Sequence, residues 1–160
     1  MDLQATIRKY NDLTDKEQLR QIIRNNKDKV PQNSENEEYL LQAAAGKKTY
    51  VLNHIEYDGE ILAAFVIADI TDLVYIELIL VDPRFTRKHN QQSLGYGTLL
   101  LRFVIKDLRD NHGCSRIVLG TDLDNIPANG LFHKFGFTLL MDDHDSNYYE
   151  LKDAALKEFK

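Results

Sequence analysis

Apolar and polar residues follow one another along the chain in two rhythms, a period of two that is typical of strands and a longer one that is typical of amphipathic helices. The first rhythm predicts strands over residues 5–10, 49–57, 60–70, 74–81, 116–121, 137–141 and 147–151. The second predicts helices over residues 14–26, 34–46, 94–111 and 125–136. Residues 153–160 form a further short helix or a tail.

The apolar positions also predict the core. Residues 61–68 are apolar on both alternations, so this strand should lie centrally in a sheet with both faces covered. The helices should bury one stripe each. The predicted stripes are Leu19, Ile22 and Ile23; Tyr96, Leu100, Phe103, Val104 and Leu108; and Ala128, Leu131, Phe132 and Phe135.

Local signals mark where elements begin and turn. Thr14–Glu17 and Ser34–Glu37 each match a capping box, in which side chains satisfy the free backbone groups at a helix start. Asn125 should cap the last of the four helices. Asp58-Gly59 is the two-residue signal for a tight hairpin turn between two antiparallel strands.

The chain has 160 residues, 43% of them hydrophobic and 28% charged, which is typical of a single soluble globular domain. No linker or repeat divides it, so we predict one domain over residues 1–160. No apolar run is long enough to cross a bilayer, and the residues from Met1 to Gln4 do not resemble a secretory signal. We therefore expect a cytoplasmic protein with no membrane partner.

The net charge of -5 disfavours nucleic acid as the main partner and suits a cationic substrate. Cys114 is the one cysteine, so an internal disulfide framework and a cysteine-based metal cluster are excluded. We expect no metal, and we expect Cys114 to be a buried neighbour of a strand.

The most informative stretch is Gln92-Ser93-Leu94-Gly95-Tyr96-Gly97, which lies between a predicted strand and a predicted helix. Backbone N–H groups at such a glycine-rich helix start form a ready site for a phosphate group. The alternative is a helix start that merely requires a tight turn. A dinucleotide-binding fold is disfavoured, because its repeated strand–helix units and ribose-binding acid are missing.

A second motif follows downstream: Asn125-x-x-Ala128-x-x-x-Phe132-x-Lys134-x-Gly136-Phe137. The two motifs and the order of elements resemble those of the GNAT superfamily of acyl-CoA-dependent N-acetyltransferases. The resemblance implies an α/β (α+β) fold with a central mixed, mostly antiparallel sheet of six to seven strands and about four flanking helices. It also implies a splayed pair formed by the strand that holds Glu77 and the strand that holds Ile117 to Leu119.

The resemblance implies acetyl-CoA as a co-substrate and no metal. The glycine turn would bind the pyrophosphate through its backbone, and Asn125 would lie near the pantetheine arm. The backbone N–H near Leu80 would polarise the thioester carbonyl. The cofactor-binding residues implied are Leu80, Val81, Gln92, Ser93, Leu94, Gly95, Tyr96, Gly97, Thr98, Asn125, Ala128, Phe132 and Lys134.

An attacking amine must be neutral, and family members often place an acid on the strand before the glycine turn, so Glu77 is the candidate base. The alternative is a surface acid that pairs with a cation. The family's frequent tyrosine, which protonates the departing thiolate, is replaced here by Phe132, which has no proton to donate. Tyr148, Tyr149, His133 or water could replace it, and we take Tyr148 as the candidate.

A second departure is the long basic loop before the glycine turn. Its cations, Arg84, Arg87, Lys88 and His89, are candidates for binding the 3′-phosphate of coenzyme A, or form only a solvated loop.

We therefore predict an N-acetyltransferase that transfers an acetyl group from acetyl-CoA to a primary amine of a small molecule or peptide by direct attack. The acidic residues Asp142, Asp143 and Asp145 could attract a cationic amine, although such clusters are more often solvated turns. The alternative function is a non-catalytic acyl-CoA-binding sensor or interaction module. A homodimer would be consistent with the family.

Overall fold

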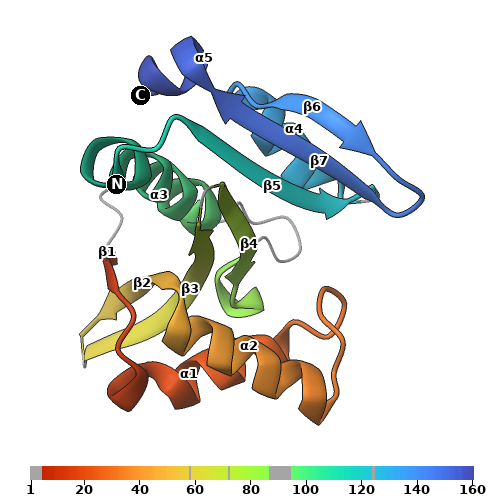
Figure 1. Cartoon of the computed structure of the whole chain (residues 1–160). Helices are drawn as coiled ribbons and strands as arrows, with labels where there is room; N and C mark the ends of the chain where they lie inside the picture. The colour runs from red at the N-terminus through yellow and green to blue at the C-terminus, as the bar shows by residue number, and fades with distance from the viewer. Residues whose placement is uncertain (1–4, 58, 72, 87–94, 124) are drawn as a thin grey trace. The chain divides into compact units, whose positions relative to one another are not determined.

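A computed structural model describes residues 5–57, 59–71, 73–86, 95–123 and 125–160 (Figure 1). The elements of this described part are, in chain order, β1 (Ala5–Lys9), α1 (Asp12–Asn25), α2 (Ser34–Gly46), β2 (Lys48–Glu56), β3 (Gly59–Ile70), β4 (Val74–Val81), the one-turn 3₁₀ helix η1 (Pro83–Phe85), α3 (Tyr96–His112), β5 (Arg116–Asp122), α4 (Ile126–Lys134), β6 (Thr138–Asp142), β7 (Ser146–Lys152) and α5 (Asp153–Lys157).

The strands form a seven-stranded sheet in the order β1-β2-β3-β4-β5-β7-β6. β1 pairs antiparallel with β2, β5 and β6 each pair antiparallel with β7, and β4 pairs parallel with β5. The predicted mixed, mostly antiparallel sheet is thus confirmed. The described part has five α-helices where about four were expected, because residues 153–157 form the short α5.

The chain forms two compact units, each described here by itself: residues 1–67 with 78–101, and residues 68–77 with 102–160. The first contains β1, β2, α1, α2, most of β3, the end of β4 and the start of α3. The second contains β5, β6, β7, α4, α5, the start of β4 and α3 from Arg102 on. That the whole chain acts as one domain stays a prediction.

In the first unit, α1 and α2 lie side by side and pack on the strands (Figure 1). The predicted stripe of Leu19, Ile22 and Ile23 is buried there. As predicted, residues 62–68 of β3 are all buried. The core of this unit is made of Leu19, Ile22, Ile23, Val30, Leu40, Leu41, Ala43, Ala44, Val51, Leu62, Phe65, Ile67 and Leu80.

Both predicted capping boxes are wrong, because an asparagine upstream caps each helix instead. The side chain of Asn11 accepts a hydrogen bond from the backbone N–H of Leu13, so α1 begins two residues before Thr14. Asn33 accepts from the N–H of Asn36 in the same way. Asparagine is among the best residues at this position, and an earlier cap leaves the serine or threonine inside the first turn.

In the second unit, buried apolar residues come from α3, α4 and the strands β5 and β7. One residue of the predicted α3 stripe is misplaced: Phe103 is 42% exposed, whereas Leu101 and Ile105 are fully buried. The buried stripe of α3 therefore includes Leu101 and Ile105 in place of Phe103. The buried apolar residues of this unit include Ile76, Val104, Ile105, Leu108, Ile117, Leu119, Phe132, Phe135, Phe137, Tyr149, Leu151 and Leu156.

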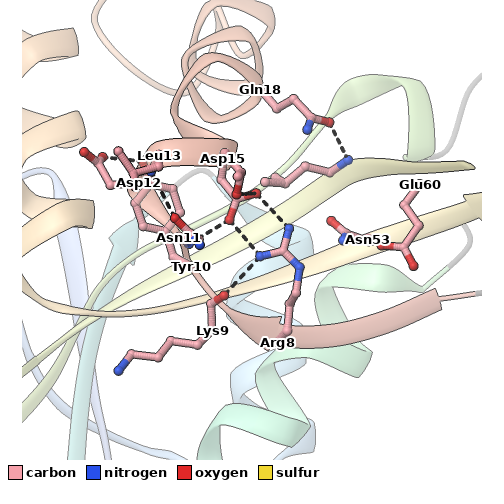
Figure 2. A network of polar contacts seen from close by, with 12 residues as sticks. Arg8, Lys9, Tyr10, Asn11, Asp12, Leu13, Asp15, Gln18, Asn53 and Glu60 are labelled. Atoms are coloured by element: carbon pink, nitrogen blue, oxygen red, sulfur yellow. Dashed lines mark hydrogen bonds and ion pairs between the residues drawn. The ribbon is translucent and has the colours of Figure 1, made fainter.

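A network of polar contacts ties β1 to the start of α1 (Figure 2). The two terminal nitrogens of the Arg8 guanidinium, Nη1 and Nη2, each donate to the carboxylate of Asp15 at 2.7 Å, and the backbone N–H of Asn11 also donates to it. Burial alone would raise the pKa of Asp15, whose side chain is 2% exposed, but these hydrogen bonds and the charge of Arg8 outweigh burial and lower the pKa. The carboxylate thus stabilises the folded unit as an anion.

We expect Asp15→Asn to destabilise the protein by about 1–3 kcal/mol at neutral pH, because one charge-assisted partner of Arg8 is lost. Since the folded pKa of Asp15 is below its unfolded value, this contribution is fully present above about pH 4 and disappears as the pH falls through the folded pKa. Denaturant unfolding across this range measures it. Asp12→Asn, an exposed acid in the same turn, is the matched control; an equal loss there would contradict the account.

Candidate active site

The second unit places three strands in one register, with β5 between β4 and β7. Leu119 pairs with Ile76 on one side and with Tyr149 on the other, and Val118 pairs with Tyr75 and Glu150. The next residue of β5, Gly120, pairs with Tyr148. The parallel pairs between β4 and β5 are Val74–Ile76 with Ile117–Leu119, so Glu77 is the first residue of β4 after the paired stretch.

Side chains on these strands alternate between two faces. Tyr149 points toward α4, where its hydroxyl donates to the side-chain oxygen of Asn129 at 2.6 Å. Tyr148 must therefore point to the opposite face. Paired residues share a face, and so do alternate residues of one strand. Gly120, which pairs with Tyr148, is therefore on the face of Tyr148, and so is Val118, two residues before it. Tyr75 pairs with Val118, so Tyr75 and Glu77 belong to that face as well.

The ring of Tyr148 lies over Gly120. A Cβ atom built on Gly120 would sit 2.8 Å from Cε1 and 2.9 Å from Cδ1 of this ring, closer than real carbon contacts. The ring thus occupies the space that a side chain on β5 would fill. The ring thus lies over β5, the strand between β7 and β4.

Tyr75 lies on the same face as Tyr148 and Glu77, and its pKa responds to both. Burial raises its pKa first, and the charges of Tyr148 and Glu77 raise it further. The strand register thus places the two predicted catalytic residues, Glu77 and Tyr148, on one face of β4, β5 and β7, each partly exposed. Sequence reasoning missed Gly120 and Tyr75; a glycine inside an otherwise apolar strand was the available signal.

Asn125 caps α4 as predicted, and its side chain accepts from the backbone N–H of Ala128 at 3.3 Å. Ala128 is partly buried in the first turn of this helix. Its neighbour Asn129, which sequence reasoning missed, donates to the carbonyls of Asp122 and Asn125. Asn129 thereby holds the loop before α4 in place.

Phe132 is buried, 3% exposed, with its ring 5.6 Å from that of Tyr149 and 5.9 Å from that of Phe137. It acts here as a core residue of the second unit. Lys134, two residues on, is exposed and lines a hollow of about 310 Å³ with Arg102, Ala155 and Phe159. The structure therefore does not bring Lys134 to the same side of α4 as Phe132.

In the first unit, Gly95 and Gly97 are glycines for different structural reasons. Gly95 has φ +74°, a conformation that other residues rarely adopt. Gly97 makes a close approach instead, since a Cβ there would lie 3.3 Å from Cγ2 of Val81. Thr98 follows in the first turn of α3, where backbone N–H groups lack a partner within the helix. Gln92, Ser93 and Leu94 lie outside the described residues.

Tyr96 points away from this turn into the first unit. It is 2% exposed, and its hydroxyl is hydrogen-bonded to Nδ1 of His54, whose Nε2 lies 3.3 Å from the carboxylate of Glu56. Phe85 packs against both rings. Burial, and next the charge of Glu56, raise the pKa of Tyr96. The side chain of Tyr96 therefore anchors the start of α3 to β2.

At the end of β4, Leu80 has its side chain in the core, and the carbonyl of Val81 accepts from Asn26 at 3.2 Å. Any contact of Leu80 with a cofactor would be through its backbone. The buried carboxylate of Asp82 accepts from the guanidinium of Arg84 at 2.7 Å, so the charge of Arg84 is already paired. The other candidate cations, Arg87, Lys88 and His89, lie outside the described residues.

The described residues contain no group of three or more His, Cys, Asp or Glu side chains that could hold a metal ion. Among them there is also no helix with the length and apolar character that a membrane span requires. Cys114 is partly rather than fully buried, and burial raises the pKa of its thiol, which makes it less reactive.

A family model described as the acetyltransferase (GNAT) family matches residues 16–137, about three quarters of the chain. The chain belongs to the GNAT acetyltransferase family. The match contains both predicted motifs and the strand between them. A search of curated proteins finds no significant match.

Solved GNAT structures share this fold. The ribosomal-protein-S18-alanine N-acetyltransferase of Escherichia coli has a TM-score of 0.72 at 20% identity, covering 92% of this chain and 93% of that one. The PaiA N-acetyltransferase of Thermoplasma acidophilum, in complex with coenzyme A, has 0.70 at 19% identity over 96% and 100%. Campylobacter jejuni PseH, in complex with acetyl coenzyme A, has 0.65 at 18% over 93% and 100%.

We expect Asn129→Ala to destabilise this GNAT chain by about 1–3 kcal/mol, because the buried hydroxyl of Tyr149 would lose its acceptor. Tyr149→Phe removes the donor instead and should cost less. In the double variant, the change at residue 129 should cost less than in the wild type, since no hydroxyl is left unpaired. Thermal and denaturant unfolding measure these differences; strictly additive costs would contradict the account.

Proposed function

We propose that this GNAT protein transfers the acetyl group of acetyl-CoA to a primary amine. The observation that carries the proposal is the placement of a carboxylate, Glu77, and a phenol, Tyr148, on one face of β4, β5 and β7, in a chain of an acetyltransferase family. These groups supply the base and the acid that acyl transfer to an amine needs.

The start of α3 supports a phosphate-binding role. The backbone at Gly95 is left-handed, residues 95 and 97 have no side chain, and the first N–H groups of the 17-residue helix α3 have no partner within the helix. This backbone fits the pyrophosphate of coenzyme A. At this turn the candidate contacts are the backbone N–H groups from Gly95 to Thr98, and Asn125 stays a candidate for the pantetheine arm.

The reaction begins with a neutral amine. An alkylamine with a pKa near 10.4 is about one part in a thousand neutral at pH 7, a cost of about 4–5 kcal/mol. Glu77 first takes the proton of the ammonium and releases it to solvent, and it takes a second proton as the neutral nitrogen attacks the thioester carbon. The new N–C bond forms, the C–S bond breaks, and the sulfur leaves as a thiolate or receives a proton from an acid.

The candidates for that acid are Tyr148, Tyr149, His133 and water, since Phe132 has no hydroxyl. The hydroxyl of Tyr149 is buried and donates to Asn129. Tyr148 is partly exposed and shares a face with Glu77, so we propose Tyr148 as the acid.

The acceptor is an amine of a small molecule or peptide. The E. coli enzyme among the similar structures is named for an alanine of a ribosomal protein, whereas for this chain the net charge of -5 favours a cationic acceptor. Of the acidic cluster, Asp143 is used structurally, since its side chain accepts from the N–H groups of Asp145 and Ser146 in the hairpin turn.

A second candidate function is acyl-CoA binding without transfer. Phe132 favours it, because this position often carries the proton donor in the family. Release of coenzyme A only when an amine is supplied distinguishes transfer from binding alone.

Acetyl-CoA should bind with micromolar or tighter affinity in calorimetric titration, and Thr98→Glu should weaken binding at least tenfold. A carboxylate in the first turn suits the helix dipole but repels the pyrophosphate, so the fold should be retained. Thr98→Gln is the neutral control of similar size. Gly97→Glu is a poorer probe, because it would also crowd Val81. Failure of the well-folded wild type to bind would remove the proposed function.

Glu77→Gln should lower kcat at neutral pH by about 10²–10⁴-fold while acetyl-CoA still binds. The loss should shrink as the pH rises, because more of the amine is then neutral without help from a base. Steady-state assays of coenzyme A release from pH 6.5 to 9.5 measure this, with calorimetry for binding. A pH-independent loss, or no loss, would argue against Glu77 as the base.

A further inference from the structure

We propose that Gly120 is a positioning residue: the absence of a side chain on β5 at this point admits the ring of Tyr148 beside Glu77 and so allows Tyr148 to act as the acid. This inference rests on the proposed function. It names a residue outside both sequence motifs and explains how this chain manages without a hydroxyl at Phe132.

The requirement for glycine at this position comes from Tyr148 and not from the backbone. Gly120 is not among the residues with positive φ, so its backbone is one that any residue adopts. A glycine inside a strand costs conformational entropy and leaves side-chain packing unused. The close contact is with the ring of Tyr148, 2.8 and 2.9 Å from the position of a Cβ. Even alanine would displace the ring.

The other glycine of this unit that lies inside an element behaves differently. Nothing lies within 4 Å of a Cβ built on Gly130 in α4. An added methyl group there meets open space, and alanine suits a helix better than glycine. Gly130 is therefore a matched control for the effect of a methyl group on a glycine of the second unit.

The register explains why the position matters for chemistry. Tyr148 pairs with Gly120, and the preceding residue of β5, Leu119, pairs with Ile76, the residue before Glu77. With no side chain at Gly120, nothing on β5 separates the phenol from the strand that carries the carboxylate. Burial raises the pKa of Tyr75, and the charges of Tyr148 and Glu77 raise it further, which agrees with a shared face for these three residues.

Together, Glu77 and Tyr148 account for every proton that moves once the amine is neutral. Glu77 takes a proton from the attacking nitrogen, and Tyr148 donates its phenolic proton to the sulfur as the C–S bond breaks. The protonated carboxyl of Glu77 then returns a proton to the phenolate of Tyr148. The net result is an amide and a free thiol, and both side chains regain their starting states without an external acid.

A purely structural role for the contact is the competing explanation, since an aromatic ring over a strand glycine also stabilises sheets. The two explanations differ in how the variants combine. If Gly120 serves only to admit the acid, replacing it has no further effect once the acid is gone. If it serves only packing, the change lowers the free energy of unfolding and leaves kcat unchanged.

The experiment compares Gly120→Ala, Tyr148→Phe, the double variant and Gly130→Ala as full-length proteins, by coenzyme A release with one amine. We expect Gly120→Ala and Tyr148→Phe each to lower kcat about 10- to 100-fold, at the low end for a general acid because a thiolate leaves readily. The double variant should lose no more than Tyr148→Phe alone, and Gly130→Ala should match the wild type. The KM for acetyl-CoA should change less than threefold throughout.

The split between kcat and stability supplies the readout that packing would not move. Loss of the acid should lower kcat in Tyr148→Phe and in Gly120→Ala, whereas a packing role alone would lower the free energy of unfolding and leave kcat as in the wild type. Multiplicative losses in the double variant, or a wild-type kcat in Gly120→Ala, would overturn the inference.

Folding and activity failures are separable. If Gly120→Ala does not fold, Gly120→Ala/Tyr148→Ala should fold as well as Tyr148→Ala by circular dichroism, since the ring that clashes is gone; failure of this double variant would overturn the proposed contact. A wild type that binds acetyl-CoA but acetylates no amine would overturn the proposed function and this inference together. An active wild type with an unaffected Tyr148→Phe would overturn the inference alone.

Discussion

The double pairing of β5, parallel to β4 on one side and antiparallel to β7 on the other, decides which face of the sheet carries Glu77 and Tyr148, the proposed base and acid. Backbone hydrogen bonds on both edges set its register, and a slip of one residue would turn every side chain to the other face. Glu77 and Tyr148 are far apart in sequence and belong to strands that are not neighbours. They share a face only because each strand is in register with β5.

The same register places two adjacent tyrosines, Tyr148 and Tyr149, on opposite faces of the sheet. Tyr149 faces α4 and joins Asn129 and Phe132 in the packed side of the unit, whereas Tyr148 faces the other side. Neither residue type nor sequence distance distinguishes them. Their roles follow from the alternation of the strand and from which face the helix covers.

Element order, strand bounds and most buried positions could be predicted from the sequence, because apolar periodicity is a local signal. The helix starts at Asn11 and Asn33 were missed, since two capping patterns overlapped and asparagine competed successfully. Phe103 was misplaced because hydrophobicity alone does not say which side of a stripe is covered. Of the proposed site, Glu77 was taken from the family resemblance, and the cap at Asn125 was predicted from the local sequence. Gly120, Asn129 and the pairing of Tyr96 with His54 depend on contacts between distant segments, which no local pattern encodes.

The outer edge of the second unit bears on how this arrangement tolerates change in sequence. The irregularity in pairing between β6 and β7 falls between Leu139 and Met141, where β6 has one residue more than its partner. The extra residue is on the edge strand, and β7 keeps an unbroken register with β5 from Lys152 to Ser146. Insertions or deletions at the edge can therefore be absorbed within β6. The register of β7 with β5 then stays unchanged, and Tyr148 stays on the same face as Glu77.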